Sequence, residues 1–335
     1  MNKNIEYSFL DLAIIGAEKS TKETLNNVLA TAQHAESLDY NRFWMAEHHN
    51  MPHIASSATS VLIGYVAGGT EKIRVGSGGI MLPNHPPLVI AEQFGTLESL
   101  YPNRIDLGLG RAPGTDQLTA MALRRNDIQS SNFFPQQINE LQTFFSASNA
   151  DAKVRAFPGE GLDIPFWILG SSTDSAYLAA ELGLPYAFAS HFAPDQIQMA
   201  AKIYKNNFKP SSQLDKPYFM PCVNAILADS TFEAEKLATS FYRMFLGILR
   251  NDRKPLQPPV ESMQGIWDVQ EEATVYNMTA CSFIGSKEEV LPELQRFCEV
   301  LEADELMITT PIYDYDKRMY SMKLFAEVMQ DLAHS

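Results

Sequence analysis

One apolar stretch of the chain ends in a carboxylate and two imidazoles, which are side chains able to hold and move protons. Glu47, His48 and His49 follow the aromatic and apolar residues at positions 43–46. The unperturbed pKa of an imidazole is about 6.5, so such a group can act as acid or base near neutral pH. In a parallel barrel the active site lies where the strands end. We therefore predict Glu47, His48 and His49 as catalytic residues, with simple solvation of a strand end as the alternative.

Glycines and an arginine mark two later apolar stretches. Gly78 and Gly79 lie within the stretch at 75–83. Glycine weakens a strand and is typical where another backbone or a flat ligand must approach closely. The stretch at 105–110 leads into Arg111, and a guanidinium can bind a phosphate through two parallel hydrogen bonds. These residues predict a planar ligand that carries a phosphate.

Residues 170–175, Gly-Ser-Ser-Thr-Asp-Ser, are small or carry hydroxyl groups, and they directly precede a predicted helix. Free backbone N–H groups at the amino terminus of a helix bind anions. Ser and Thr at a helix start are also ordinary N-caps, which is the alternative for this segment taken alone. In combination with Arg111, the segment favours a site for a phosphate-bearing cofactor that contains Gly170, Ser171, Ser172 and Ser175.

Other nucleotide and metal motifs are missing from the sequence. Pro113 stands where a dinucleotide fingerprint has its third glycine, and no Walker lysine follows a strand, so neither an NAD nor an ATP site is expected. The Glu and His residues within 47–53 can in principle bind zinc. However, neighbouring strand residues point to opposite faces, and neither HxH nor HExxH occurs. We expect no metal site.

Two further histidines stand near other strand ends. His191 follows the apolar stretch at 186–189, and we expect it to line the same site. His85 stands between Asn84 and Pro86, and we expect it to be structural.

Alternating strands and helices must position these residues. Apolar periodicity and the Gly and Pro residues between segments predict strands at 5–12, 42–47, 73–82, 105–110, 165–169, 186–189, 218–227 and 305–309. They predict helices at 21–37, 56–68, 87–100, 135–145, 176–182, 194–206, 232–249, 288–301 and 317–332. Eight strand and helix units favour one domain over 1–335, a single (β/α)8 TIM barrel, rather than an open doubly wound sheet.

The segment at 251–277 interrupts this alternation. It contains Lys-Pro-Leu-Gln-Pro-Pro-Val and little periodicity, and loops of this length in compact domains are usually functional or mobile. We predict an insertion before the last βα unit, acting either as a lid over the site or as a disordered surface loop.

Composition narrows the class of protein. The 335 residues are 45% hydrophobic and 20% charged, which is typical of a folded globular protein with ample core material. The 26 Lys and Arg against 40 Asp and Glu give a net charge of −14, which argues against nucleic-acid or anionic-membrane partners. The cysteines are few and far apart, and neither a signal peptide nor an apolar run of about 20 residues is found. We expect a cytoplasmic protein with reduced thiols.

Four motifs together resemble the bacterial luciferase-like flavin monooxygenase family. They are Glu47-His-His49 and the segments at 75–86, 104–111 and 169–175, and the resemblance runs from about residue 5 to 325. It implies a (β/α)8 barrel that binds FMN, often as a homodimer, and receives reduced FMN from a separate NAD(P)H:flavin reductase. It implies oxygenation of a small organic substrate by O2 through a flavin C4a-hydroperoxide, as in alkanal monooxygenases.

The resemblance also implies roles for particular residues. Arg111 and the turn at 170–175 would hold the FMN phosphate, and the backbone at 78–79, where relatives have a non-proline cis peptide, would face the isoalloxazine. His48 would be the polar group nearest the reacting edge of the flavin. The chain departs from true luciferases at Gly110, where they have a cysteine, so light emission is not implied.

Two alternatives stay open on the same barrel. One is hydride transfer by the deazaflavin F420 without O2. The other is a flavin-binding protein without turnover, against which the two imidazoles and the long insertion argue.

Overall fold

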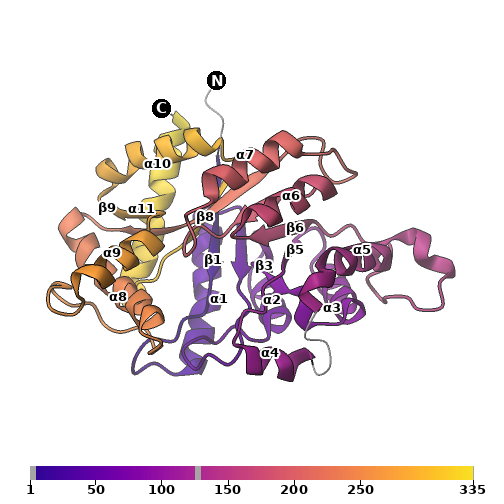
Figure 1. Ribbon diagram of the computed structural model, residues 1–335, viewed down its shortest axis with the longest axis horizontal. Coiled ribbons are helices and arrows are strands. Elements are labelled where there is room, and N and C mark those ends of the chain that lie inside the picture. The colour runs from indigo at the N-terminus through magenta and orange to yellow at the C-terminus, as the bar shows by residue number, and fades with distance from the viewer. Residues whose placement is uncertain (1–4, 125–129, 335) are drawn as a thin grey trace.

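The computed structural model describes residues 5–124 and 130–334, and its centre is a closed parallel barrel (Figure 1). The barrel strands follow one another in the order β1, β2, β3, β5, β6, β7, β8 and β10, and pairing of β10 with both β8 and β1 closes the ring. Their bounds are Glu6–Asp11, Arg42–Met45, Arg74–Ser77, Ile105–Gly110, Phe166–Gly170, Tyr186–Phe188, Phe219–Leu227 and Glu305–Thr309. The predicted TIM barrel is confirmed.

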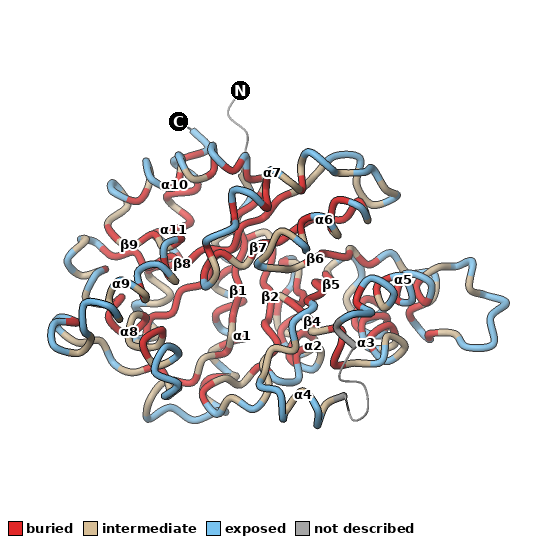
Figure 2. Tube along the Cα trace, viewed as in Figure 1, coloured by how far each residue is buried: buried red, intermediate tan, exposed pale blue. Residues whose placement is uncertain are grey.

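The strands form because they can be buried on both faces. Every residue of β2, β5, β8 and β10 is buried, and continuously apolar strands of this kind are typical of parallel sheets covered by helices. Burial is accordingly concentrated in the central strands (Figure 2). The short strand β4 (Ile80–Met81) continues beyond β3 and pairs with β5.

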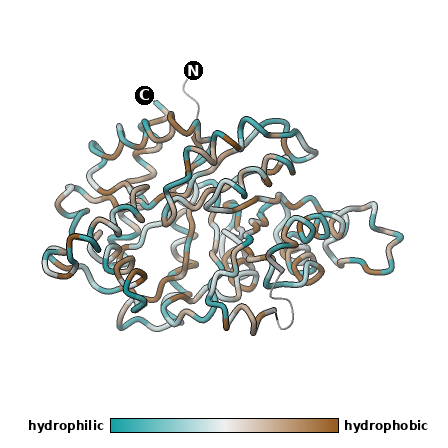
Figure 3. The backbone as a smooth tube through the Cα atoms, in the orientation of Figure 1, coloured by the Kyte–Doolittle hydropathy of each residue, from teal (hydrophilic) through white to brown (hydrophobic). Residues whose placement is uncertain are grey.

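Helices cover the outside of the barrel and connect successive strands. Hydrophobic and hydrophilic residues alternate along them, so that one side faces the strands (Figure 3). They are α1 (Thr21–Ser37), α2 (Thr59–Gly68), α3 (Pro87–Leu100), α5 (Phe134–Phe145), α6 (Thr173–Leu182), α7 (Ile197–Asn207), α8 (Thr231–Leu249), α10 (Lys287–Leu301) and α11 (Tyr315–His334). Short 3-10 turns occur at Leu82–Asn84, Ser130–Phe133 and Ala147–Asp151.

A layer of aromatic and charged side chains fills the barrel interior. Trp167 packs edge-to-face on both Trp44 and Tyr218. Below them the Arg42 guanidinium bonds Asp106 and Glu305, each at 2.8 Å, and both carboxylates have no exposed side-chain surface. Ion pairing inside the barrel thus joins β2, β5 and β10, strands that are far apart in sequence.

The predicted loop at 251–277 is wrong in part, because it contains a helix. Helix α9 (Val269–Met278) begins at a capping box in which Asp268 and Glu271 satisfy each other's backbone N–H groups. The helix buries only Val275, which explains why apolar periodicity did not indicate it. Trp267 and Tyr276 pack against Tyr242 of α8 and fix α9 to that helix.

Two further elements were not predicted. Strand β9 (Ser282–Gly285) pairs with the carboxyl half of β8 outside the barrel ring, and its four residues are too few for a clear period. Helix α4 (Gln117–Arg124) follows Arg111 and is largely exposed. Within the described residues, no helix has the length and apolarity needed to cross a bilayer.

Candidate active site

A cavity of about 960 Å³ opens at the carboxyl ends of the barrel strands. Its lining includes most of the residues predicted for the site, namely Glu47, His48, His49, Gly78, Arg111, Gly170, Ser171, Ser172, Ser175 and His191. These residues follow β2, β3, β5, β6 and β7 and come together only because parallel strands end at the same face. The structure therefore gathers these predicted residues around one cavity.

Glu47 forms the centre of a hydrogen-bond network beside this cavity. Its Oε1 accepts hydrogen bonds from Nε2 of His49 at 2.8 Å and Nε2 of His85 at 2.9 Å, and its Oε2 accepts one from the Met81 backbone N–H at 3.1 Å. Burial raises the pKa of Glu47, but the bonds from both imidazoles outweigh burial and bring the pKa to about 2. Because a carboxylate only accepts, both imidazoles carry a hydrogen on Nε2.

This network places His85, which was expected to be structural, beside Glu47. Glu47, His49 and His85 also have the ligand types and the proximity that a metal ion needs. We nevertheless keep the prediction of no metal, because the Glu47 carboxylate already has donors on both oxygens.

His48 is held differently from His49, whose Nε2 donates to Glu47. The Nδ1 of His48 is buried and has no hydrogen-bond partner among the described residues. Burial lowers the pKa of His48, so the imidazole is neutral at pH 7. A neutral imidazole with a free ring nitrogen beside a cavity can accept or relay a proton.

The peptide between Gly78 and Gly79 is cis, as the family resemblance implied. Gly78 lines the cavity, whereas Gly79 is not among its lining residues in the described chain. A Cβ at Gly79 would lie 2.8 Å from the carbonyl oxygen of Gly108, so contact with β5 accounts for this glycine. Direct contact with a ligand is therefore expected of Gly78 and not of Gly79.

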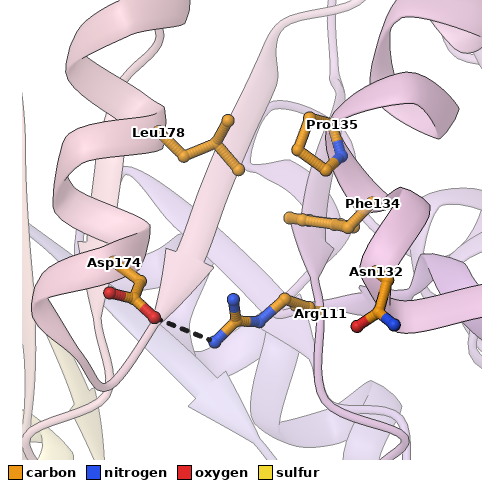
Figure 4. A pocket seen from close by; sticks show the side chains of 6 residues that line it. All are labelled: Arg111, Asn132, Phe134, Pro135, Asp174 and Leu178. Carbon is orange, nitrogen blue, oxygen red and sulfur yellow. Dashed lines mark ion pairs between the residues drawn. The ribbon is translucent and has the colours of Figure 1, made fainter. Parts of the chain in front are cut away.

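Arg111 and the amino terminus of α6 lie next to each other at the rim. The Nη2 of Arg111 is 3.6 Å from Oδ2 of Asp174 in the first turn of α6 (Figure 4). A hollow of about 290 Å³ beside them is lined by Phe134, Pro135 and Leu178. The long ion pair leaves Arg111 available, since 53% of its side chain is exposed.

The serines before α6 are not all used as caps. Ser172 occupies the N-cap position, but its side chain makes no capping hydrogen bond. The Ser175 hydroxyl instead donates to the Ser172 carbonyl at 2.7 Å and contacts the Tyr186 hydroxyl. The plain N-cap alternative thus does not account for Ser172, whose hydroxyl remains free to bind a phosphate.

His191 reaches the cavity from the end of β7 and is buried, with no partner for Nδ1 within the described residues. Burial, with a smaller effect from His48, lowers the pKa of His191 to about 3. Asn224 holds the segment by donating to the His191 carbonyl at 2.8 Å. His191 is therefore a second neutral imidazole facing the cavity.

We expect His191 to make the protein less stable in mild acid. An imidazole in the unfolded chain titrates near 6.5, so between that pH and about 3 the unfolded chain binds a proton that folded His191 does not. Stability therefore falls as the pH falls, by about 1.4 kcal/mol per unit, or about 2 kcal/mol from this residue at pH 5. Urea unfolding of wild type and His191→Gln at pH 7 and pH 5 checks this. The variant should lose about 2 kcal/mol less over this interval, and equal losses would contradict the assignment.

The sequence did not indicate the far wall of the cavity. Met244, Phe245 and Ile248 of α8 line it, together with Arg253 from the insertion and His53 from the loop after β2. The apolar positions of α8 predict packing in the hydrophobic core, because a helix that faces a cavity has the same apolar periodicity as one that packs on a sheet.

Comparison with known proteins assigns the family. Imidazoles and an arginine around a cavity at the carboxyl ends of the strands are typical of TIM-barrel enzymes. Enzymes with this fold catalyse many different reactions, so the fold alone does not identify the reaction. This chain belongs to the luciferase-like monooxygenase family, whose sequence profile matches residues 5–301. The resemblance expected from the four motifs is thereby confirmed, and the protein is an oxidoreductase of the monooxygenase kind.

Individual relatives agree with this assignment. A luciferase-like monooxygenase of Escherichia coli is 49% identical over 99% of both chains. An N-acetyl-S-alkylcysteine monooxygenase of Bacillus subtilis is 33% identical over 97% of this chain and 98% of the relative. The crystal structure of apo-MsnO8 is 28% identical, covers 97% of this chain and 98% of its own, and superposes with a TM-score of 0.87.

More distant structures share the fold alone. One is the oxygenating constituent of 3,6-diketocamphane monooxygenase from Pseudomonas putida in complex with FMN, at 17% identity and a TM-score of 0.72. Another is an F420-dependent secondary alcohol dehydrogenase, at 12% identity and a TM-score of 0.68. Each alignment covers at least 97% of this chain and at least 97% of the matched chain.

Proposed function

We propose that this protein is the oxygenase component of a two-component monooxygenase that uses reduced FMN and O2 to oxygenate a small organic molecule. The observation that carries the proposal is the arrangement around the cavity. The exposed guanidinium of Arg111, with a long ion pair to Asp174, and a helix amino terminus lie at one side, and neutral imidazoles with nitrogens unpartnered among the described residues lie within. The guanidinium and the helix amino terminus can together bind a single terminal phosphate. The imidazoles can transfer protons.

The residues present fit FMN, and each would have a definite task. Arg111, the Ser172 hydroxyl and the backbone at the start of α6 would hold the phosphate, and Gly78 leaves room for the ring. Reduced FMN, when bound, supplies the electrons that activate O2. His48 would move the proton at its Nδ1, His191 would bound the site from β7, and Glu47 with His49 would hold the strand end. The apolar wall of α8 would exclude water.

F420 is the second candidate cofactor, favoured only by the shared barrel of F420-dependent enzymes. FMN has more support, because the relatives above 30% identity with assigned names are monooxygenases. The name of one of them suggests a thioether as substrate class.

The proposal includes partners. A separate NAD(P)H:flavin reductase would supply reduced FMN, since the sequence has no nicotinamide motif. A homodimer is also proposed, for which α2 offers Val61 and Tyr65 one turn apart, with 69% and 43% of their surface exposed. Light scattering of the purified protein measures this state.

Oxygen labelling tests the proposed reaction. Photoreduced FMN is mixed with the protein, a simple dialkyl thioether and ¹⁸O₂, and the product is analysed by mass spectrometry. We expect one ¹⁸O atom in the sulfoxide, and none when NADH replaces reduced FMN. Substrate oxidation by F420 without O2 would support the hydride-transfer alternative. Tight FMN binding without product from any substrate tried would support a flavin-binding protein without turnover.

Arg111→Ala should weaken FMN binding without unfolding the protein. A hydrogen bond to a charged group is worth about 1.5 to 3 kcal/mol, so the Kd should rise roughly ten- to 150-fold. Fluorescence titration with FMN measures the Kd, and Lys209→Ala, which removes an exposed cation paired with Glu181 elsewhere, is the control. An unchanged Kd for Arg111→Ala would remove this residue from the site, and a preference for FAD over FMN would contradict the phosphate assignment.

A further inference from the structure

The cavity carries a cation that the proposed cofactor site does not use. Arg253 belongs to the insertion, lines the cavity on the side of α8 and contacts the sulfur of Met51 at 3.8 Å. It forms no ion pair with a carboxylate among the described residues. The neighbouring cation Lys254, by contrast, pairs with Asp252, and Arg250 pairs with Glu271 at 2.7 Å. Arg243 also lines the cavity without an ion pair, but its Nη1 donates to the Pro258 carbonyl at 2.8 Å, whereas Arg253 has no such oxygen acceptor among the described residues.

The backbone around Arg253 is held in place on both sides. The Asp252 N–H donates to the Gly247 carbonyl at 2.8 Å, and this approach requires glycine, since a Cβ at Gly247 would lie 2.9 Å from the Asp252 carbonyl oxygen. On the other side, Leu256 forms a β-bridge with Gly16, in which its N–H donates to Ile15 and its carbonyl accepts from Ala17. The guanidinium thus extends from an anchored segment.

One imidazole that lines the cavity with Arg253 also has a nitrogen without a partner among the described residues. His53 is 7% exposed, lines the same cavity, and its Nδ1 has no hydrogen-bond partner among the described residues. Arg253 is close enough to act electrostatically on two imidazoles, because its charge helps burial to lower the pKa of His53 and of His48. A guanidinium and a buried imidazole nitrogen without partners, on the same cavity, indicate a polar group of a ligand.

Apolar side chains also line the cavity. Met244, Phe245 and Ile248 of α8 face it, as do Ile14, Ile54 and Pro311 from the barrel loops. This apolar lining, together with a cation that has no oxygen acceptor among the described residues, suits a molecule with an apolar body and one anionic end.

We propose that Arg253 determines substrate specificity by binding a carboxylate of the organic substrate, so that the substrate class is small apolar carboxylic acids. This inference rests on the proposed function, because it names the substrate of the same site. Arg253 and Arg111 then divide the two anions between them. Arg111 binds the cofactor phosphate beside α6, and Arg253 binds the substrate carboxylate beside α8.

Binding without turnover tests the inference separately from the proposed reaction. Hexanoate and its neutral isostere hexanamide are titrated into the FMN-loaded protein by calorimetry. We expect wild type to bind hexanoate at least roughly tenfold more tightly than hexanamide, as expected for a charged hydrogen bond. Arg253→Met should abolish this preference while leaving hexanamide and FMN binding within about twofold, and Arg253→Lys should restore part of it.

Lys254→Met is the matched control, because Lys254 is the adjacent cavity-lining cation and already has an acidic partner. It should change hexanoate binding less than about twofold. Equal binding or no binding of the two probes by wild type would overturn the inference, as would a loss of FMN rather than hexanoate affinity in Arg253→Met. If the acid preference depends on Arg253 but no oxygenation is found, the substrate site stands and the proposed reaction fails.

Discussion

Replacing His48 by alanine should lower the rate of substrate oxygenation by about 10²- to 10⁴-fold, the usual effect of losing a positioned acid or base. The protein should still fold and bind FMN, because the proposed phosphate contacts are made by Arg111 and the start of α6 and do not include His48. His48 makes no bond to Glu47 that resembles those of His49 and His85, so its removal leaves that network intact.

The measurement is the rate of oxygenated product under saturating reduced FMN, with FMN affinity and melting temperature determined on the same samples. His49→Ala is the matched control. It removes one of two imidazole donors to a buried carboxylate, so it should lower the melting temperature more than His48→Ala does and the oxygenation rate less. Normal oxygenation by folded His48→Ala protein would refute the catalytic role.

Replacing Arg42 by methionine should lower the free energy of unfolding by about 3 to 5 kcal/mol, the usual cost of leaving a buried charge without its partner. Arg42 is the cation common to Asp106 and Glu305. Asp106 keeps Arg74 at 2.6 Å after the change. Among the described residues Glu305 keeps only uncharged donors, such as Tyr218 at 2.9 Å and Asn41 at 3.3 Å.

Urea unfolding at pH 7 measures the loss, and Arg74→Met is the control. Arg74 is 25% exposed and leaves Asp106 with Arg42, so its replacement should cost only roughly 1 to 2 kcal/mol. An unfolding free energy equal to that of wild type would show that the ion pairs contribute nothing net.

The sequence was sufficient for the barrel because its strands are mostly apolar and alternate regularly with helices. It was sufficient for the rim residues because parallel strands bring their carboxyl ends together, so that Glu47, Arg111 and His191 could be assigned to one site before their distances were known. Elements with a weak apolar signal were missed, and α9, which buries only Val275, is the clearest example.

Contacts between side chains that are distant in the chain could not be predicted from the sequence. That His85 shares a carboxylate with His49 depends on the turn at Leu82–Asn84. That Arg253 lies on the cavity depends in part on a bridge between Leu256 and Gly16, which are 240 positions apart in the chain. Neither contact has a local pattern, because both are set by how loops return to the barrel.

The solvent exposure of Arg111 has a consequence for how long the protein survives in a cell. The side chain proposed to hold the phosphate is 53% exposed, so the proposed cofactor could be reached from solvent and exchanged. A ligand that binds only the folded state stabilises it by about 2.7 kcal/mol at a hundredfold excess over Kd. Resistance to proteolysis, and with it the amount of protein present, would therefore rise and fall with the supply of free flavin.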